Sequence, residues 1–97
     1  MSLGRILVVE DDQQIADVVE HLLKSNDYEV RTAADGQAAL RQFKSYRPDL
    51  VFLDLNLPRL SGWEVLRQIR QERSDIPVIM LTSQTEEADR VLGLERG

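Results

Sequence analysis

The chain has 97 residues, which is enough for one domain of ordinary size and no more. Its 17 acidic residues outnumber its 12 lysines and arginines and give a net charge of −5, a sign that argues against direct binding to nucleic acid or an anionic membrane. The absence of cysteine excludes disulfides and thiolate metal sites, and no apolar run approaches the ~20 residues that span a bilayer. With no signal-peptide pattern at the N-terminus, a cytoplasmic domain is expected.

The first part of the chain predicts a strand followed by a helix. Arg5–Val9 is a β-branched apolar run that is too short for a stable helix, which favours a strand buried on both faces. From Gln13 the apolar spacing becomes helical, and Asp12 is placed to cap the free amides of that helix. The apolar residues that define one face of the predicted helix are Ile15, Val18, Val19, Leu22 and Leu23.

A second strand and helix are expected next. Asn26 and Asp27 end the first helix, and residues 28–33 alternate as a strand. Gly36 then opens a helix that stops near residues 46–48. The residues that this helix is expected to turn inward are Ala39, Leu40 and Phe43.

Two further strand–helix units complete the pattern. Residues 50–53 are the most apolar predicted strand, with Asp54 at its C-terminal end, and residues 78–81 form the fourth strand. Between them, a loop leads to a helix with Trp63, Leu66 and Ile69 spaced for burial, and residues 86–95 predict a last helix. Four such units in a row predict an α/β fold with a doubly wound parallel sheet and helices on both faces.

Acidic and hydroxyl residues gather at the carboxyl ends of the predicted strands, where open parallel sheets bind their ligands. Glu10, Asp11 and Asp12 follow the first strand, Asp54 the third and Thr82 the fourth. Taken singly, the acidic run also fits a solvated turn with a helix cap, and Asp54 fits a residue that caps a turn. If the first and third strands are neighbours, their carboxylates converge and repel, so they need a cation or a raised pKa. An all-oxygen cluster suits Mg²⁺ best.

Three separated motifs now stand in order at the predicted strand ends. They are Ile6-Leu7-Val8-Val9-Glu10-Asp11-Asp12, then Asp54-Leu55-Asn56-Leu57-Pro58 with Gly62, then Met80-Leu81-Thr82-Ser83. From Arg5 to Gly97 the chain resembles the receiver domain of two-component response regulators, most of all receivers joined to a winged-helix DNA-binding domain. The resemblance implies a flavodoxin-like fold with strand order 2-1-3-4 in one domain over residues 1–97. It also implies that the fifth strand–helix unit is missing, so that the domain is truncated at its C-terminus. Residues 1–3 are compatible with a cloning remnant.

The resemblance also assigns roles to residues of the acidic edge. Asp54 matches the aspartate that accepts a phosphoryl group from a histidine kinase. Asp11 matches the acid that binds Mg²⁺ directly, and Glu10 the acid that acts through a water. Asn56 matches the position whose backbone carbonyl completes the metal ligands, while Asp12 fits the helix cap.

Two further residues and the partners follow from the same resemblance. Thr82 matches the switch hydroxyl that meets the phosphoryl oxygen, and Arg90 matches a basic residue used in receiver homodimers. The implied partners are a sensor histidine kinase and, through an absent output domain, DNA. The family's phosphoryl-contacting lysine has no counterpart, because Lys24 and Lys44 fall in helical segments away from the acidic edge.

Three functions compete on this reading. The leading one is a signalling module, not an enzyme, whose phosphorylation switches an output that controls transcription. The second is a Mg²⁺-dependent phosphatase with an aspartyl-phosphate intermediate; such enzymes need an acid two residues after the nucleophile, where this chain has Asn56. The third is a degenerate or truncated receiver that only binds partners. The intact acids and Thr82 argue against degeneracy, whereas the missing lysine keeps truncation open.

Overall fold

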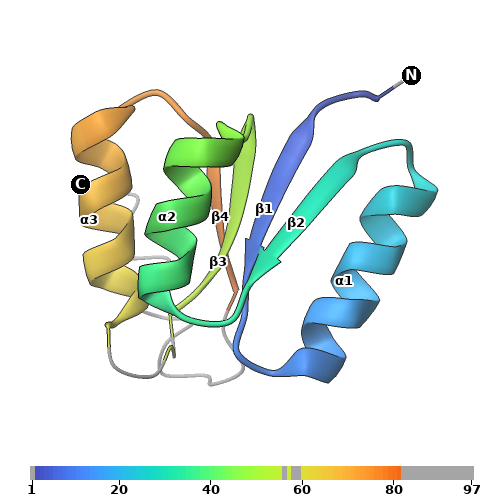
Figure 1. Ribbon diagram of the computed structural model, residues 1–97, viewed down its shortest axis with the longest axis horizontal. Helices are drawn as coiled ribbons and strands as arrows, with labels where there is room; N and C mark the ends of the chain where they lie inside the picture. Colours follow the sequence, from blue (N-terminus) through green and yellow to red (C-terminus); the bar gives the residue numbers. More distant parts are fainter. Residues whose placement is uncertain (1, 56, 58–59, 82–97) are drawn as a thin grey trace.

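The computed structural model describes residues 2–55, 57 and 60–81 (Figure 1). Strands and helices alternate along this part of the chain, as the sequence predicts. The elements are β1 (Arg5–Val9), α1 (Gln13–Ser25), β2 (Glu29–Ala33), α2 (Gly36–Tyr46), β3 (Leu50–Asp54), α3 (Gly62–Glu72) and β4 (Val78–Leu81). The helix predicted over residues 86–95 lies outside the described residues.

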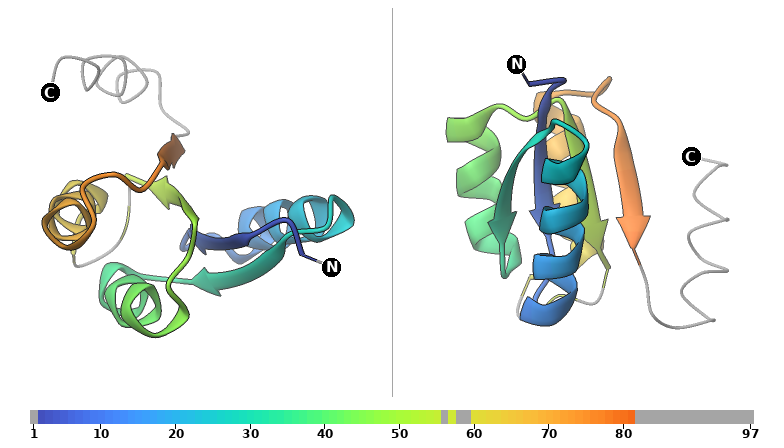
Figure 2. Two further views of the ribbon diagram at one scale, coloured as in Figure 1. Left: turned by 90° about the horizontal axis from the view of Figure 1, so that it is seen from above. Right: turned by 90° about the vertical axis from the view of Figure 1, so that its right-hand side faces the viewer.

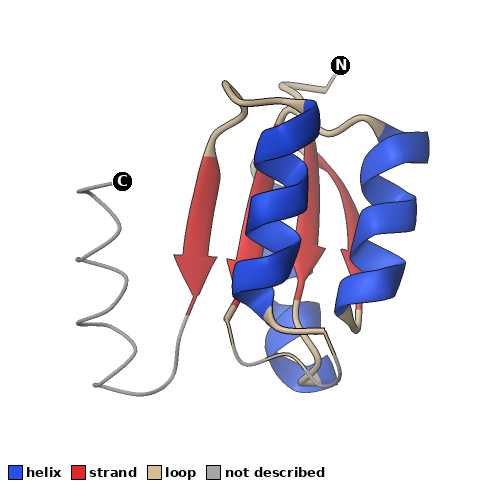
Figure 3. Ribbon diagram, turned by 90° about the vertical axis from the view of Figure 1, so that its left-hand side faces the viewer, coloured by secondary structure: helices blue, strands red, loops and turns tan. Residues whose placement is uncertain are grey.

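The four strands form one parallel sheet in the order β2-β1-β3-β4, which confirms the predicted topology. Figure 3 shows the four arrows pointing the same way. In the register of the sheet, Val9 at the end of β1 pairs with Ala33 of β2 and with Leu53 of β3. The carboxyl ends of β1, β2 and β3 therefore reach the same edge. Asp54 is the last residue of β3, inside the strand instead of after it, and pairs with Leu81 of β4.

Helices α2 and α3 cover one face of the sheet and α1 lies on the other, as the view from above makes clear (Figure 2). The larger core fills the space under α2 and α3, and its fully buried members include Leu7, Val51, Leu53, Val65 and Ile69. The strands β1 and β3 contribute alternate side chains to this core and the side chains between them to the opposite face of the sheet. Because both faces are covered, the apolar runs of these strands are nearly continuous. Burial from both sides holds the ends of these two strands in place.

The predicted apolar face of α1 is only partly right. Val19 and Leu23 pack against the small core of Ile6, Val8 and Val30. The other three residues of that face remain 42%, 67% and 60% exposed: Ile15, Val18 and Leu22. The physical reason is one of width, because a five-residue stripe is broader than the surface of β1 and β2 that α1 covers in the described part of the chain.

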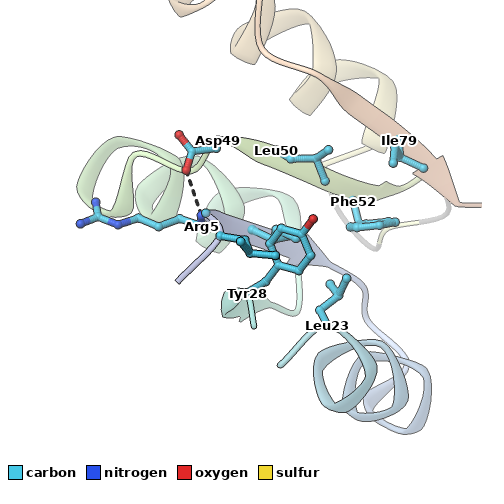
Figure 4. A pocket seen from close by; sticks show the side chains of 10 residues that line it. Arg5, Leu23, Tyr28, Asp49, Leu50, Phe52 and Ile79 are labelled. Carbon is cyan, nitrogen blue, oxygen red and sulfur yellow. Dashed lines mark hydrogen bonds between the residues drawn. The ribbon is translucent and has the colours of Figure 1, made fainter. Parts of the chain in front are cut away.

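Beside α1, the same face of the sheet holds an apolar groove of about 370 Å³. Figure 4 shows Leu50 and Phe52 of β3 and Ile79 of β4 along it, with Leu23 of α1 on the other side. The groove lies toward the start of β1 and β3, where the Arg5 backbone N–H donates to the Asp49 carboxylate at 2.9 Å. It therefore lies away from the acidic edge of the sheet and contains none of the acidic site residues.

Each helix begins with a capping side chain. Asp12 caps α1, Asp35 caps α2 and Ser61 caps α3, each accepting a hydrogen bond from an amide in the first turn. In residues 2–55, 57 and 60–81 each of these helices follows a parallel strand, so the starts of α1, α2 and α3 lie at the edge where the strands end. None of the helices in the described ranges is long and apolar enough to cross a membrane.

Candidate functional site

Three carboxylates meet at the carboxyl ends of β1 and β3. Glu10 and Asp11 follow the last residue of β1, and Asp54 ends β3. One carboxylate oxygen from each of the three residues lies within 4.8 Å of the other two. The structure thus brings together the acids of two strands that are separated by more than 40 residues of sequence but adjacent in the sheet.

The three acids differ in their exposure to solvent. Glu10 and Asp54 are each only 6% exposed, whereas Asp11 is exposed. Two carboxylates buried side by side are costly unless a proton or a cation compensates the charge. The exposed Asp11 leaves the cluster open to solvent on one side, which gives a cation from solution a way in.

Backbone hydrogen bonds orient Glu10. Its N–H donates to the Ala33 carbonyl at 3.0 Å, and its carboxylate accepts from the Asp12 N–H at 3.0 Å. The Asp12 side chain itself points to α1, where its Oδ1 accepts from the amides of Gln14 at 2.9 Å and Ile15 at 3.3 Å. Asp12 is therefore the helix cap, and its backbone holds the Glu10 carboxylate at the site.

Burial raises the pKa of Glu10 from 4.5 to about 7. The Asp12 N–H opposes this shift, because a hydrogen bond to the carboxylate favours the charged form. Hydrogen bonding and charge repulsion from Asp54 add to the increase, and a hydrogen bond with Asp11 adds further. Without a cation, the raised pKa thus keeps the Glu10 carboxyl partly protonated near neutral pH.

This raised pKa predicts how stability varies with pH when divalent metal is removed. Between pH 4.5 and about 7 the folded state retains the Glu10 proton that the unfolded chain loses, so stability should fall as pH rises through that window. Urea unfolding in a chelator at a series of pH values measures the slope. Glu10→Gln should flatten the fall, while Glu29→Gln, exposed on β2, should keep it. A wild-type stability that rises steadily across this window would contradict the assignment.

The donor set fits magnesium. All three ligand candidates offer carboxylate oxygen, and hard oxygen ligands with several retained waters are what Mg²⁺ prefers. Glu10, Asp11 and Asp54 would hold the ion, and a bound cation would offset the repulsion between the two buried carboxylates. The cluster is thus suited to bind a divalent cation beside a buried aspartate.

Three of the residues singled out from the sequence lie outside the described residues: Asn56, Thr82 and Arg90. Their expected roles stay predictions. Both lysines lie within the described ranges, and each pairs away from the acidic edge: Lys24 with Glu20 at 2.7 Å and Lys44 with Glu72 at 3.6 Å. As the sequence indicates, neither lysine serves the carboxylate cluster.

Comparison with known proteins now gives the class. The model of the response regulator receiver domain family matches residues 6–97, and the chain belongs to that family. The fold agrees, since solved receiver structures superimpose on it. One is the N-terminal domain of a response regulator receiver protein from Methanoculleus marisnigri, with a TM-score of 0.81 and 39% identity over 92% of this chain and 76% of that one. Another is the response regulator TrrA from Thermotoga maritima in complex with Mg(2+)-BeF, with a TM-score of 0.81 and 40% identity over 89% of this chain and 73% of that one.

The curated relatives are longer proteins than this chain. The alkaline phosphatase synthesis transcriptional regulatory protein PhoP of Bacillus subtilis is 45% identical over 96% of this chain and 39% of its own length. The response regulator MprA of Mycolicibacterium vanbaalenii is 44% identical over 96% of this chain and 40% of its own length. The chain thus spans about two fifths of these relatives and corresponds to their receiver part.

Proposed function

We propose that this chain is a phosphorylation switch: Asp54 accepts a phosphoryl group from a phosphohistidine of a sensor kinase, in a reaction that requires Mg²⁺. The observation that carries the proposal is the buried Asp54 carboxylate within 4.8 Å of the Glu10 and Asp11 oxygens. Asp54 lies at the end of a central parallel strand, and this end of the sheet is where such folds bind ligands. The Thermotoga relative, a response regulator in complex with Mg(2+)-BeF, supports Mg²⁺ as the ion.

The chemistry that this geometry supports is a single displacement at phosphorus. An Asp54 oxygen attacks, an oxygen–phosphorus bond forms, and the nitrogen–phosphorus bond of the donor breaks, with its electron pair returning to the imidazole. A bound Mg²⁺ would supply compensation for charge on the phosphoryl oxygens. Glu10 and Asp11 would hold that ion together with Asp54, and the burial of Asp54 limits competing reactions with water. The product is an acyl phosphate on Asp54.

The partners follow from the same proposal. The donor is a sensor histidine kinase, and the acidic chain itself makes no DNA contact. The relative PhoP of Bacillus subtilis, which is named as a transcriptional regulatory protein, supports control of transcription through an output domain. Thr82 would meet the phosphoryl group as the switch hydroxyl, Asn56 would complete the metal ligands through its backbone carbonyl, and Arg90 would serve a receiver homodimer. The protein is a switch and not a turnover enzyme, because position 56 carries an amide where a phosphatase of this type needs an acid.

Mass spectrometry of the intact protein tests the proposal. The chain is incubated with Mg²⁺ and a small acyl-phosphate donor, and the mass is expected to increase by one phosphoryl group. Chelation of the metal should prevent the increase, because the charge on the phosphoryl oxygens is then uncompensated. Incorporation that is equally fast with and without divalent metal would contradict the proposed role of the carboxylates. Steady release of inorganic phosphate without a modified protein would favour a phosphatase.

A further inference from the structure

The start of α3 lies directly against the backbone of the strand that carries Asp54. Gly62 is the first residue of α3 and is buried. A Cβ atom added to it would lie 2.4 Å from the Asp54 carbonyl oxygen and 2.6 Å from the Leu55 Cα. Both distances are far below any van der Waals contact between such atoms, so no side chain fits between α3 and the end of β3.

We propose that Gly62 is a positioning residue for the phosphorylation site. By letting α3 begin in contact with the Asp54–Leu55 backbone, it sets where the Asp54 carboxylate lies relative to those of Glu10 and Asp11. Gly62 touches neither metal nor phosphoryl group and acts through Asp54. The inference rests on the proposed function, since it assigns Gly62 a part in that same site.

The need for glycine at this position is steric and not conformational. Gly62 stands in the first turn of a regular helix whose cap, Ser61, accepts a hydrogen bond from the Glu64 amide at 3.2 Å. Alanine is the better helix former by about 1 kcal/mol, so backbone propensity alone would favour it here. Any loss caused by Gly62→Ala must therefore come from the contact with Asp54 and Leu55.

The clash cannot be relieved by moving α3 away at low cost. Val65 and Ile69, one and two turns further along α3, are fully buried in the larger core. On the other side, Leu55 is only 5% exposed and cannot simply swing outward. Because such interiors are close-packed, an added methyl group must shift the end of β3, the helix, or both. A shift of the end of β3 changes the position of Asp54 relative to Glu10 and Asp11, and the ligand distances of a metal site are held to within about 0.2 Å.

Gly36 provides a matched control. It is also buried and opens a helix, α2, at the same edge of the sheet. A Cβ at Gly36 would lie 2.8 Å from Val65 Cγ2 and 2.9 Å from Leu60 Cβ, and it would meet no atom of Asp54 or Leu55 at comparable distance. Both glycine-to-alanine substitutions are expected to lower stability, but only Gly62→Ala should disturb the carboxylate cluster.

The test measures magnesium affinity and not only activity. The wild-type chain, Gly62→Ala and Gly36→Ala are titrated with Mg²⁺ by calorimetry, at a temperature where circular dichroism shows each to be folded. Gly62→Ala should bind about 10–100-fold more weakly, as expected for loss of a residue that orients a ligand. Gly36→Ala should bind like the wild type. Unchanged affinity in Gly62→Ala, or an equal loss in both variants, would overturn the inference. If the wild type itself fails to bind Mg²⁺, it is the proposed function that fails.

If Gly62→Ala does not fold, amide hydrogen exchange of the wild type provides the answer. A contact that fixes Asp54 must work in both directions, so Mg²⁺ at the cluster should steady the start of α3. The Val65 amide donates to the Ser61 carbonyl at 3.1 Å in the first turn of α3, and the Ala39 amide donates to the Asp35 carbonyl at 3.0 Å in the first turn of α2. Exchange should therefore slow more at the Val65 amide than at the Ala39 amide. Equal slowing at both helix starts would show that Mg²⁺ stabilises only the fold as a whole.

Discussion

Asp54→Asn is expected to abolish phosphoryl incorporation completely while leaving the domain folded. The amide has nearly the shape of the carboxylate but lacks the charged oxygen that attacks phosphorus, so no acyl phosphate can form. The substitution also removes a carboxylate that repels Glu10, whose pKa Asp54 helps to raise. The stability of the Asp54→Asn variant at neutral pH, measured by thermal melting, should therefore not fall below that of the wild type. Intact mass after treatment with Mg²⁺ and an acyl-phosphate donor measures the incorporation.

Asp17→Asn is the matched control for this experiment. Asp17 is exposed on α1, where its carboxylate accepts a hydrogen bond from the Gln13 side chain at 2.7 Å. The same chemical change there should leave incorporation at the wild-type level. Phosphoryl incorporation that persists in Asp54→Asn would show that another residue is the acceptor.

Magnesium is expected to stabilise the fold, and Asp11→Ala should remove the effect. An ion bound only by the folded state at 100 times its dissociation constant adds about 2.7 kcal/mol to the free energy of unfolding. For a domain of this size each kcal/mol raises the melting temperature by about 4–8 °C, so the shift is large. Thermal melts in a chelator and in saturating Mg²⁺ give the two values.

The exposure of Asp11 makes it the informative residue to replace. Because its side chain is exposed, Asp11→Ala should change the stability of the metal-free fold little, and the loss of the Mg²⁺ effect can be read directly. Asp17→Ala, also an exposed aspartate, should retain the full shift. A melting temperature of the wild type that does not respond to Mg²⁺ would contradict a metal site at Glu10, Asp11 and Asp54.

The strand–helix order and the meeting of the acids were predictable because each has a strong local signal. The runs at Arg5–Val9 and in β3 are short and mostly apolar, which is typical of strands buried on both faces. Parallel strands place their carboxyl ends at one edge, so two acidic strand ends must approach each other once β1 and β3 are neighbours. In the structure β1 and β3 pair directly, so their acidic ends do approach each other.

The surroundings of α1 were not predictable in the same way. Hydrophobic periodicity indicates which residues favour burial, but it does not say how much surface is present to bury them. Ile15 and Leu22 satisfy the period and stay exposed, because α1 covers only β1 and β2 in the part of the chain that the structure describes. The distance between a helix and a strand end is likewise a three-dimensional quantity. In the sequence Gly62 indicates only a turn or a helix start, and its contact with Asp54 appears once the strand and helix are packed.

The acceptor residue is the central claim, and locating the phosphoryl group tests it most directly. After treatment with Mg²⁺ and an acyl-phosphate donor, the protein is reduced with borohydride, which converts an aspartyl phosphate to homoserine, and is then digested and sequenced by mass spectrometry. We predict that the converted residue is Asp54 alone, with Glu10, Asp11 and the exposed His21 unmodified. Conversion at Asp11, phosphate on His21, or no modified residue at all would contradict the account.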